Sequence, residues 1–197
     1  YKRQAIGGKG KMMIVASSRL AAVRYLQEMR RYLEDMKQGP NAKDYENIDV
    51  LVAFSGTVKD GGVEYTEPQL NVRKDGTHIN ETQLKSDFHD DFNVLVVAEK
   101  YQTGFDEPLL HTMIVDKKLK GVKAVQTLSR LNRVCQGKTD TFILDFINSA
   151  EEIKKAFEPF YTETFLKESI NTDLIFEVQA KIAEANITAS IIVAIFG

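Results

Sequence analysis

The sequence has few of the residues that build disulfide frameworks, zinc sites or generally basic surfaces. Its single cysteine, Cys135, excludes a disulfide within the chain and fits a reducing compartment. The three histidines are scattered without the spacing of zinc ligands, so we predict no metal site. The formal net charge of −2 argues against a protein that binds nucleic acid through an overall basic surface, although it leaves room for a local basic track.

The sequence also shows no pattern typical of a signal peptide or of a membrane-spanning helix. Lys2 and Arg3 are not followed by the apolar run of a signal peptide. The apolar stretch at residues 189–196 is too short to cross a bilayer. We therefore expect a cytoplasmic location and no contact with a membrane. The chain starts with Tyr1 and not with methionine, and we expect it to be part of a longer protein.

Five short apolar runs are present, and they predict a buried parallel sheet. The runs are rich in β-branched and aliphatic residues without polar alternation, which is typical of parallel strands covered on both faces. Helical patterns lie between them. This alternation predicts an α/β fold, a doubly wound parallel sheet with helices on both faces. The predicted strands are residues 12–16, 50–54, 94–98, 113–115 and 141–146, and the predicted helices are residues 18–38, 81–92 and 122–135.

Two parts of the chain depart from this alternation. Residues 55–80 are rich in glycine, threonine, aspartate and glutamate, and they predict an exposed insertion. After Phe146 only helical patterns follow, at residues 150–160, 163–170 and 174–185. We therefore predict a linker over residues 1–10, an α/β domain over residues 11–148, and the start of a helical region over residues 149–197.

Gln126, Arg130 and Arg133 form the most informative pattern, on the third predicted helix. At about 100° per residue, their spacing places them in a stripe roughly 60° wide. Two permanently charged, fork-shaped donors on one face suit a site that grips negative charge, such as the phosphates of a nucleotide. Taken alone, such a stripe is more often a solvated helix face. The opposite side of the helix is predicted to pack in the core through Ala124, Leu128, Leu131 and Cys135.

The glycine-rich run at residues 7–11 looks like a phosphate loop but lacks the context of one. A Walker A loop follows a strand and ends in Gly-Lys-Ser/Thr. This run precedes the first predicted strand, and Met12 stands where the hydroxyl residue is needed. We therefore interpret it as a linker. No other segment of the sequence supplies the lysine and the Mg²⁺ ligands that nucleoside triphosphate hydrolysis requires.

Four segments are expected at the carboxyl edge of the sheet, where ligands of doubly wound folds gather. Each alone is more simply a helix cap or a turn, as for Ser18 and Gly104. Found together in this order, they favour a binding site. The segments are Ser17, Ser18 and Arg19, then Ser55 and Gly56, then residues 99–106, and finally the helix that carries the two arginines.

The order of these segments resembles the second RecA-like domain of superfamily 2 helicases and translocases. A closer resemblance, over roughly residues 11–180, is to the motor (R) subunit of type I restriction enzymes. The most specific part is Tyr-Gln-Thr-Gly-Phe-Asp at residues 101–106 and its continuation to Arg133. A colinear match of this length is far more specific than any single motif. The likeness is carried by residues 13–25, 51–56, 101–118, 121–133 and 141–146.

The resemblance implies roles for individual residues. Arg130 and Arg133 match the arginines of motif VI, which reach across a cleft to a triphosphate and stabilise charge on its γ-phosphate. Gln126 opens the same motif, and Gly104 and Asp106 match motif V, at the junction of the nucleotide and DNA sites. The implied contacts with the DNA backbone come from Ser17, Ser18, Arg19, Ser55, Gly56, Lys100 and Thr103.

The resemblance also implies an activity and partners. The chain would be one lobe of an ATP-dependent translocase on double-stranded DNA, within an endonuclease that also has methylation and specificity subunits. ATP and Mg²⁺ would be held mainly by a first RecA-like domain, which this sequence does not include, so the isolated chain is expected to be inactive. Two alternatives stay open: the lobe of another superfamily 2 helicase, and a non-catalytic domain that binds a nucleotide or a protein.

Overall fold

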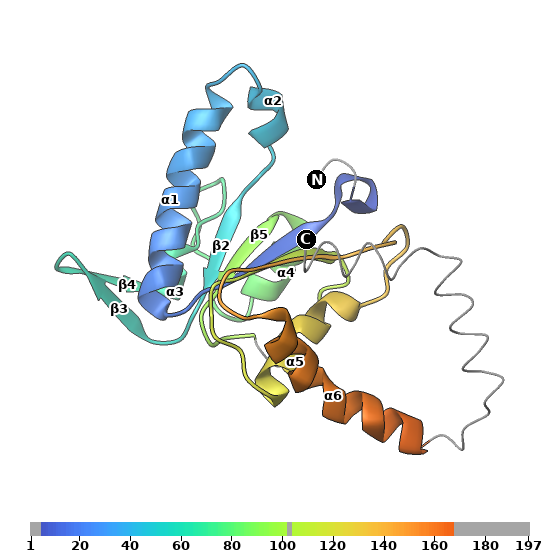
Figure 1. Ribbon diagram of the computed structural model, residues 1–197. Coiled ribbons are helices and arrows are strands. Elements are labelled where there is room, and N and C mark those ends of the chain that lie inside the picture. The colour runs from blue at the N-terminus through green and yellow to red at the C-terminus, as the bar shows by residue number, and fades with distance from the viewer. Residues whose placement is uncertain (1–4, 102–103, 168–197) are drawn as a thin grey trace.

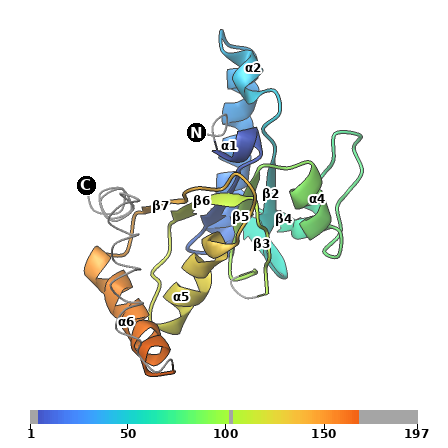
Figure 2. The same ribbon diagram turned by 90° about the vertical axis from the view of Figure 1, so that its right-hand side faces the viewer.

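The apolar runs predicted as strands pair into one parallel sheet of five strands, in the order β2-β5-β1-β6-β7. The computed structural model describes residues 5–101 and 104–167 of the chain (Figure 1). Figure 2 shows α1 on one side of this sheet and α5 and α6 on the other, so the predicted α/β fold is confirmed. The strands are β1 (Lys11–Val15), β2 (Val50–Ala53), β5 (Val94–Val97), β6 (Leu110–Val115) and β7 (Phe142–Asp145).

Both faces of the central strands are buried. Successive side chains of a strand point to opposite faces. In β1, Met13 and Val15 pack in the cluster that contains residues of α4, α5 and α6, whereas Ile14 packs in the cluster that contains residues of α1. None of these three side chains is more than 4% exposed. This burial on two sides is why the strands lack polar alternation in the sequence.

The helix α1 (Arg19–Lys37) confirms the first predicted helix. Ser18 has an extended backbone, and its side chain accepts a hydrogen bond from the amide of Ala21 at 3.0 Å, as an N-cap residue does. The helix packs on the sheet through Ala22, Val23, Leu26 and Leu33. The second predicted helix is also present but shorter, as α4 (Leu84–Asp90).

The third predicted helix is less regular than expected. The helix α5 (Val122–Leu128) is followed by a 3-10 turn, η2 (Ser129–Asn132), and Arg133 has extended backbone angles. Because a 3-10 turn has a tighter period than an α-helix, the predicted stripe does not continue from Gln126 to the arginines. Gln126 therefore lies in an α-helix, Arg130 in a 3-10 turn and Arg133 in extended backbone.

The packing side of this segment is predicted correctly except for its last member. Ala124, Leu128 and Leu131 are buried, at most 6% exposed. Cys135 lies beyond the turn and is only partly buried, beside Val134, which is 95% exposed. The prediction that Cys135 packs in the core is wrong, because the helix that would carry it inward ends before it.

The predicted insertion is an ordered layer that covers one edge of the sheet. It contains an antiparallel hairpin of β3 (Thr57–Asp60) and β4 (Val63–Thr66), followed by α3 (Glu67–Leu70). Two of its polar residues, Glu67 and Asn71, are only 3% and 0% exposed. The prediction of a fully exposed insertion is therefore wrong, although the hairpin itself is largely exposed.

Asn71 pairs with the edge strand β2 in the way a neighbouring strand would. Its side chain accepts a hydrogen bond from the amide of Val52 at 2.9 Å and donates one to the carbonyl of Val52 at 2.7 Å. An edge strand otherwise presents unpaired backbone groups. The insertion thus satisfies part of the open edge of β2.

The outer strand on the opposite side of the sheet is β7. Leu144 in this strand and Phe146 just after it are 39% and 63% exposed. The strand leads into α6 (Ala150–Lys167), a single helix where the sequence predicted two. The predicted helix at residues 174–185 lies outside the described residues, and the predicted domain boundaries stay a prediction. Within the described part of the chain, none of the helices combines the length and apolarity that a membrane span requires.

Replacing Asn71 with alanine leaves the amide and the carbonyl of Val52 buried without their side-chain partner. We expect Asn71→Ala to lower the free energy of unfolding by about 2–6 kcal/mol, on the order of one to three kcal/mol for each of the two lost partners. Asn41→Ala is the matched control, because Asn41 is exposed and its side chain makes no capping hydrogen bond. It should change stability by less than about 0.5 kcal/mol. Urea unfolding followed by circular dichroism checks both, and equal effects would contradict the role given to Asn71.

Candidate functional site

Two of the predicted segments meet at the carboxyl edge of the sheet. Arg19 begins α1 just after β1, and its Nη1 donates to the carbonyl of Ser55 at 3.0 Å. Gly56 follows with a φ of +81°, and a Cβ added there would lie 3.0 Å from the same Nη1. The structure therefore brings these residues together as predicted, and all five of the group are exposed: Ser17, Ser18, Arg19, Ser55 and Gly56.

The hairpin that follows Gly56 is tied to α1 by an ion pair. The Nε and Nη2 atoms of Arg24 donate to the two carboxylate oxygens of Asp60, both at 2.9 Å. The hydrogen bond from Arg24 holds the pKa of Asp60 below its ordinary value. Helix α1 thus contacts both this loop, at Ser55, and the hairpin that follows it, at Asp60.

Asp116 also belongs to this edge, although it was not among the residues predicted from the sequence. It follows β6, and its Oδ2 accepts hydrogen bonds from Tyr25 Oη at 2.9 Å and from Ser17 Oγ at 3.4 Å. Burial raises the pKa of Tyr25, and the hydrogen bond to Asp116 raises it further. The signal that could have found Asp116 is its position directly after an apolar strand, where the carboxyl edge begins.

Lys100 is less accessible than a DNA-contacting residue would be. Its Nζ lies 2.9 Å from carboxylate oxygens of both Glu67 and Glu81, and its side chain is only 11% exposed. Neither carboxylate was singled out from the sequence. Thr103, which was predicted to contact DNA as well, lies outside the described residues.

The two predicted arginines both contact the segment that contains Gly104 and Asp106. Arg130 Nη1 donates to the carbonyl of Phe105 at 3.0 Å, and Arg133 Nε donates to Asp106 Oδ1 at 2.7 Å. The Arg133–Asp106 pair is exposed, with 45% and 72% of the two side chains accessible. The residues matched to motifs V and VI are therefore neighbours in space.

The arginines lie away from the carboxyl edge, and here the structure differs from the expected single site. Nearby Lys138 donates to the carbonyls of Leu131, Arg133 and Pro108, and Pro108 lies just before the start of β6. A helix that connects two parallel strands must return the chain to the edge where strands begin. Gln126 lies on the exposed side of that helix, about one turn before Arg130.

The charges of this second group act on one another. Burial lowers the pKa of Arg130, and the positive charge of Arg133 lowers it further, while Asp106 acts in the opposite direction. Asp106 is also the carboxylate that pairs with Arg133. Asp106 thus interacts electrostatically with both guanidinium groups.

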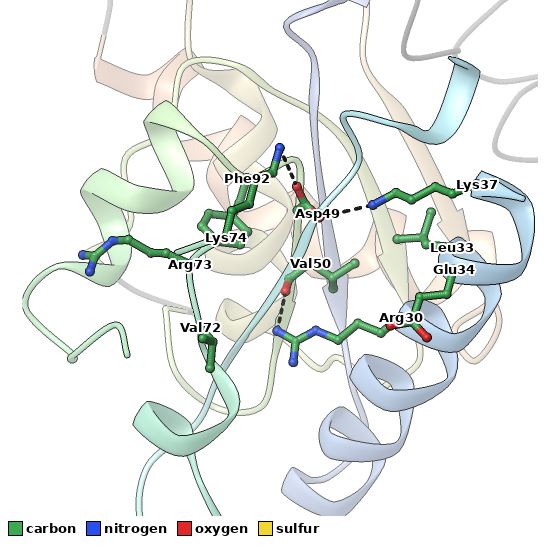
Figure 3. A pocket seen from close by; sticks show the side chains of 10 residues that line it. All are labelled: Arg30, Leu33, Glu34, Lys37, Asp49, Val50, Val72, Arg73, Lys74 and Phe92. Atoms are coloured by element: carbon green, nitrogen blue, oxygen red, sulfur yellow. Dashed lines mark hydrogen bonds and ion pairs between the residues drawn. The ribbon is translucent and has the colours of Figure 1, made fainter. Parts of the chain in front are cut away.

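A pocket of about 230 Å³ beside α1, drawn in Figure 3, is rich in cations but already internally paired. Arg30 donates to the carbonyls of Leu70 and Val50 at 2.9 and 3.0 Å. Lys37 and Lys74 both lie within 3.6 Å of Asp49. We interpret these contacts as structural, because they hold α1 against the insertion. Among the described residues, no three histidine, cysteine or acidic side chains are grouped to hold a metal ion.

The parallel sheet, its strand order and the loops at its two edges define an α/β protein of the RecA-like, doubly wound class. Residues 65–148 match the family model described as type I restriction enzyme subunit R domain 3. The resemblance to type I restriction enzyme R subunits that the sequence predicted is thereby confirmed.

Curated relatives are named as endonuclease subunits of type I restriction enzymes, and their identity to this chain is modest. A putative type I restriction enzyme MjaIXP endonuclease subunit of Methanocaldococcus jannaschii is 28% identical over 165 residues, which are 84% of this chain and 14% of the relative. The type I restriction enzyme HindI endonuclease subunit of Haemophilus influenzae is 26% identical over 167 residues, 83% of this chain and 15% of the relative. The chain thus spans only about one seventh of the length of these two relatives.

Gly56 offers a direct test of the contact at the carboxyl edge. Gly56→Ala places a Cβ against the guanidinium of Arg19 and also strains a backbone with positive φ. Gly62→Ala is the matched control, because its φ is +83° and nothing lies within 4 Å of the added Cβ. We expect Gly62→Ala to cost about 1–2 kcal/mol of unfolding free energy, and Gly56→Ala to cost roughly 1 kcal/mol more for the displaced hydrogen bond. Equal losses in urea unfolding would show that Arg19 does not hold this loop.

Proposed function

We propose that this chain is the second motor lobe of an ATP-dependent translocase on double-stranded DNA, in the R subunit of a type I restriction endonuclease. The observation that carries the proposal is the contact of Arg130 and Arg133 with the segment around Asp106. These two guanidinium groups lie together, away from the carboxyl edge of the sheet. A separate, exposed group of polar residues lies at the carboxyl edge. A motor needs both, one for the nucleotide and one for the DNA.

The arginines suit the outer end of a triphosphate that another domain holds. An exposed ion pair contributes only about 0–1 kcal/mol, so Arg133 can exchange Asp106 for a phosphate oxygen at little cost. A guanidinium binds phosphate through two parallel hydrogen bonds and keeps its charge at any physiological pH. In this proposal Arg130 and Arg133 stabilise the charge that develops on the γ-phosphate, and Gln126 contacts the nucleotide one turn earlier.

The chain fits the outer phosphate of ATP better than the rest of the nucleotide and its Mg²⁺. Gly7 and Gly8 of the glycine-rich run lie in the short turn η1 (Ala5–Gly8), and Lys11 at the end of the run begins β1, so the run precedes a strand and does not join a strand to a helix. ATP and Mg²⁺ would therefore be held mainly by a first lobe elsewhere in the protein. When bound, ATP supplies the phosphoryl group whose transfer to water drives the motor.

Arg133→Ala in the full-length protein that carries this chain tests the arginine role. We expect ATP binding to be retained and ATP turnover to fall roughly a thousandfold, the loss that removal of an arginine finger causes. Arg31→Ala is the control, because Arg31 is 71% exposed on α1 and pairs with Glu28 of the same helix. Steady-state ATPase assays and binding of an ATP analogue check both, and full turnover in Arg133→Ala would contradict the proposal.

The group at the carboxyl edge suits the DNA backbone. The start of α1 and the guanidinium of Arg19 favour a phosphate. Contacts of this kind carry no sequence information, as a motor that moves along DNA requires. Lys100 contributes less than the sequence indicated, since Glu67 and Glu81 already hold its charge. In the whole enzyme, methylation and specificity subunits would choose the DNA site.

Arg19→Ala tests the DNA contact. We expect the affinity of the full-length protein for duplex DNA to fall by a similar factor for unrelated sequences, and the slope of log affinity against log salt to decrease by about one. Fluorescence anisotropy with two unrelated duplexes at several salt concentrations measures both, with Arg31→Ala again as the control. A loss confined to one sequence, or an unchanged slope, would show that Arg19 makes no backbone contact.

A further inference from the structure

Glu67 is a buried carboxylate that neither predicted site explains. It is 3% exposed, at the start of α3 in the insertion. Its Oε2 accepts a hydrogen bond from the amide of Phe54 at 2.8 Å, and both carboxylate oxygens lie 2.9 Å from Lys100 Nζ. Phe54 immediately precedes Ser55 and Gly56. Glu67 therefore joins the loop at the carboxyl edge to the segment that follows β5.

The charge of Glu67 is not needed for pairing with the edge strand. The neutral side chain of Asn71 forms hydrogen bonds with the backbone of Val52 without carrying a charge. A buried charge is costly unless it is paired and hydrogen-bonded. Burial raises the pKa of Glu67, and Lys100 opposes that change. The negative charge of Glu67 therefore serves to pair with Lys100.

From Lys100 a continuous set of contacts leads to the two arginines. Lys100 Nζ lies 5.6 Å from the ring centre of Tyr101, and the rings of Tyr101 and Phe105 have centres 5.1 Å apart. The carbonyl of Phe105 accepts the hydrogen bond of Arg130. The next residue, Asp106, pairs with Arg133.

The backbone beside Lys100 is held in a strained form. Glu99 and Tyr101 have φ values of +61° and +62°, a region that residues other than glycine rarely adopt. Such conformations persist where the surrounding contacts hold them, and they favour segments with more than one arrangement. The ion pair of Lys100 with Glu67 lies between these two residues and fixes the segment in the arrangement described.

We propose that Glu67 is a positioning residue that couples the DNA-facing loop at Ser55 and Gly56 to the arginine pair through Lys100. The inference rests on the proposed function and gives the insertion a role in it. When DNA shifts the loop, the amide of Phe54 moves Glu67, and Lys100 transmits the change to the segment that contacts Arg130 and Arg133. Coupling of this kind is reciprocal, so bound nucleotide changes DNA affinity by the same factor.

The test measures that factor in the full-length protein. The affinity for a duplex of arbitrary sequence is determined with and without a non-hydrolysable ATP analogue, and the ratio of the two dissociation constants reports the coupling. Glu67→Gln keeps an acceptor for the amide of Phe54 but removes the charge that holds Lys100. We expect the ratio to approach one, a loss of about fivefold or more. A purely structural role would lower the amount of folded protein without changing the ratio.

Two further variants make the test specific. Glu81→Gln is the matched control, because Glu81 also contacts Lys100 but is 70% exposed, and its ratio should stay within about twofold of the wild type. Lys100→Gln provides a second route if Glu67→Gln folds poorly. The double variant Glu67→Gln/Lys100→Gln should lose no more coupling than either single variant, since the two side chains act as one pair.

Failure of this inference is distinguishable from failure of the proposed function. A wild-type ratio well away from one that Glu67→Gln preserves would overturn the coupling role, while loss of turnover in Arg133→Ala would still support the motor function. A wild-type ratio of one would also overturn the coupling role. Normal turnover in Arg133→Ala would overturn the motor function itself.

Discussion

The parallel pairing of β1 with β5 and β6 is the constraint on which both candidate sites depend. All strands of the sheet start at one edge and end at the other, so the residues after β1 and β2 must gather at the carboxyl edge. The connecting helix α5 must in turn end near the opposite edge. The strands are only four to six residues long, which separates the two edges by roughly 13–20 Å. The fold thereby sets the distance between the proposed DNA and nucleotide contacts.

One connection crosses that distance with no helix among its described residues, 98–101 and 104–109. The chain leaves β5 at Val97 and enters β6 at Leu110, and Phe105 within this segment is 2% exposed. A parallel pair usually places a helix in such a crossover. Here Phe105 packs in the core against the sheet instead. Lys100 in this connection contacts Glu67 of the insertion, and Asp106 contacts Arg133. In the proposed coupling, these contacts link the polar insertion to the arginines.

Much of the fold is predictable from local pattern, and most of what is not depends on contacts between distant segments. The strands and the cap at Ser18 are predictable because their burial and bonding are encoded in consecutive residues. The burial of Glu67 and Asn71 is not, since polar side chains are satisfied there by the backbone of β2. Most residues of each candidate group could be named from the sequence, but Asp116 was missed. The division of these residues between the two ends of the strands was not predicted either, although it follows from the return of α5 toward the end where the strands begin.

The two outer strands of the sheet, β2 and β7, differ in whether their backbone groups are already paired. At β2 the side chain of Asn71 already occupies backbone groups that another strand would use, and the insertion covers that side. Among the described residues, no strand pairs with the outer side of β7, and apolar side chains are exposed there at Leu144 and Phe146. Within the described part of the chain, a further strand would therefore add beside β7, so growth of the sheet is directional, away from the insertion and on the side of α6.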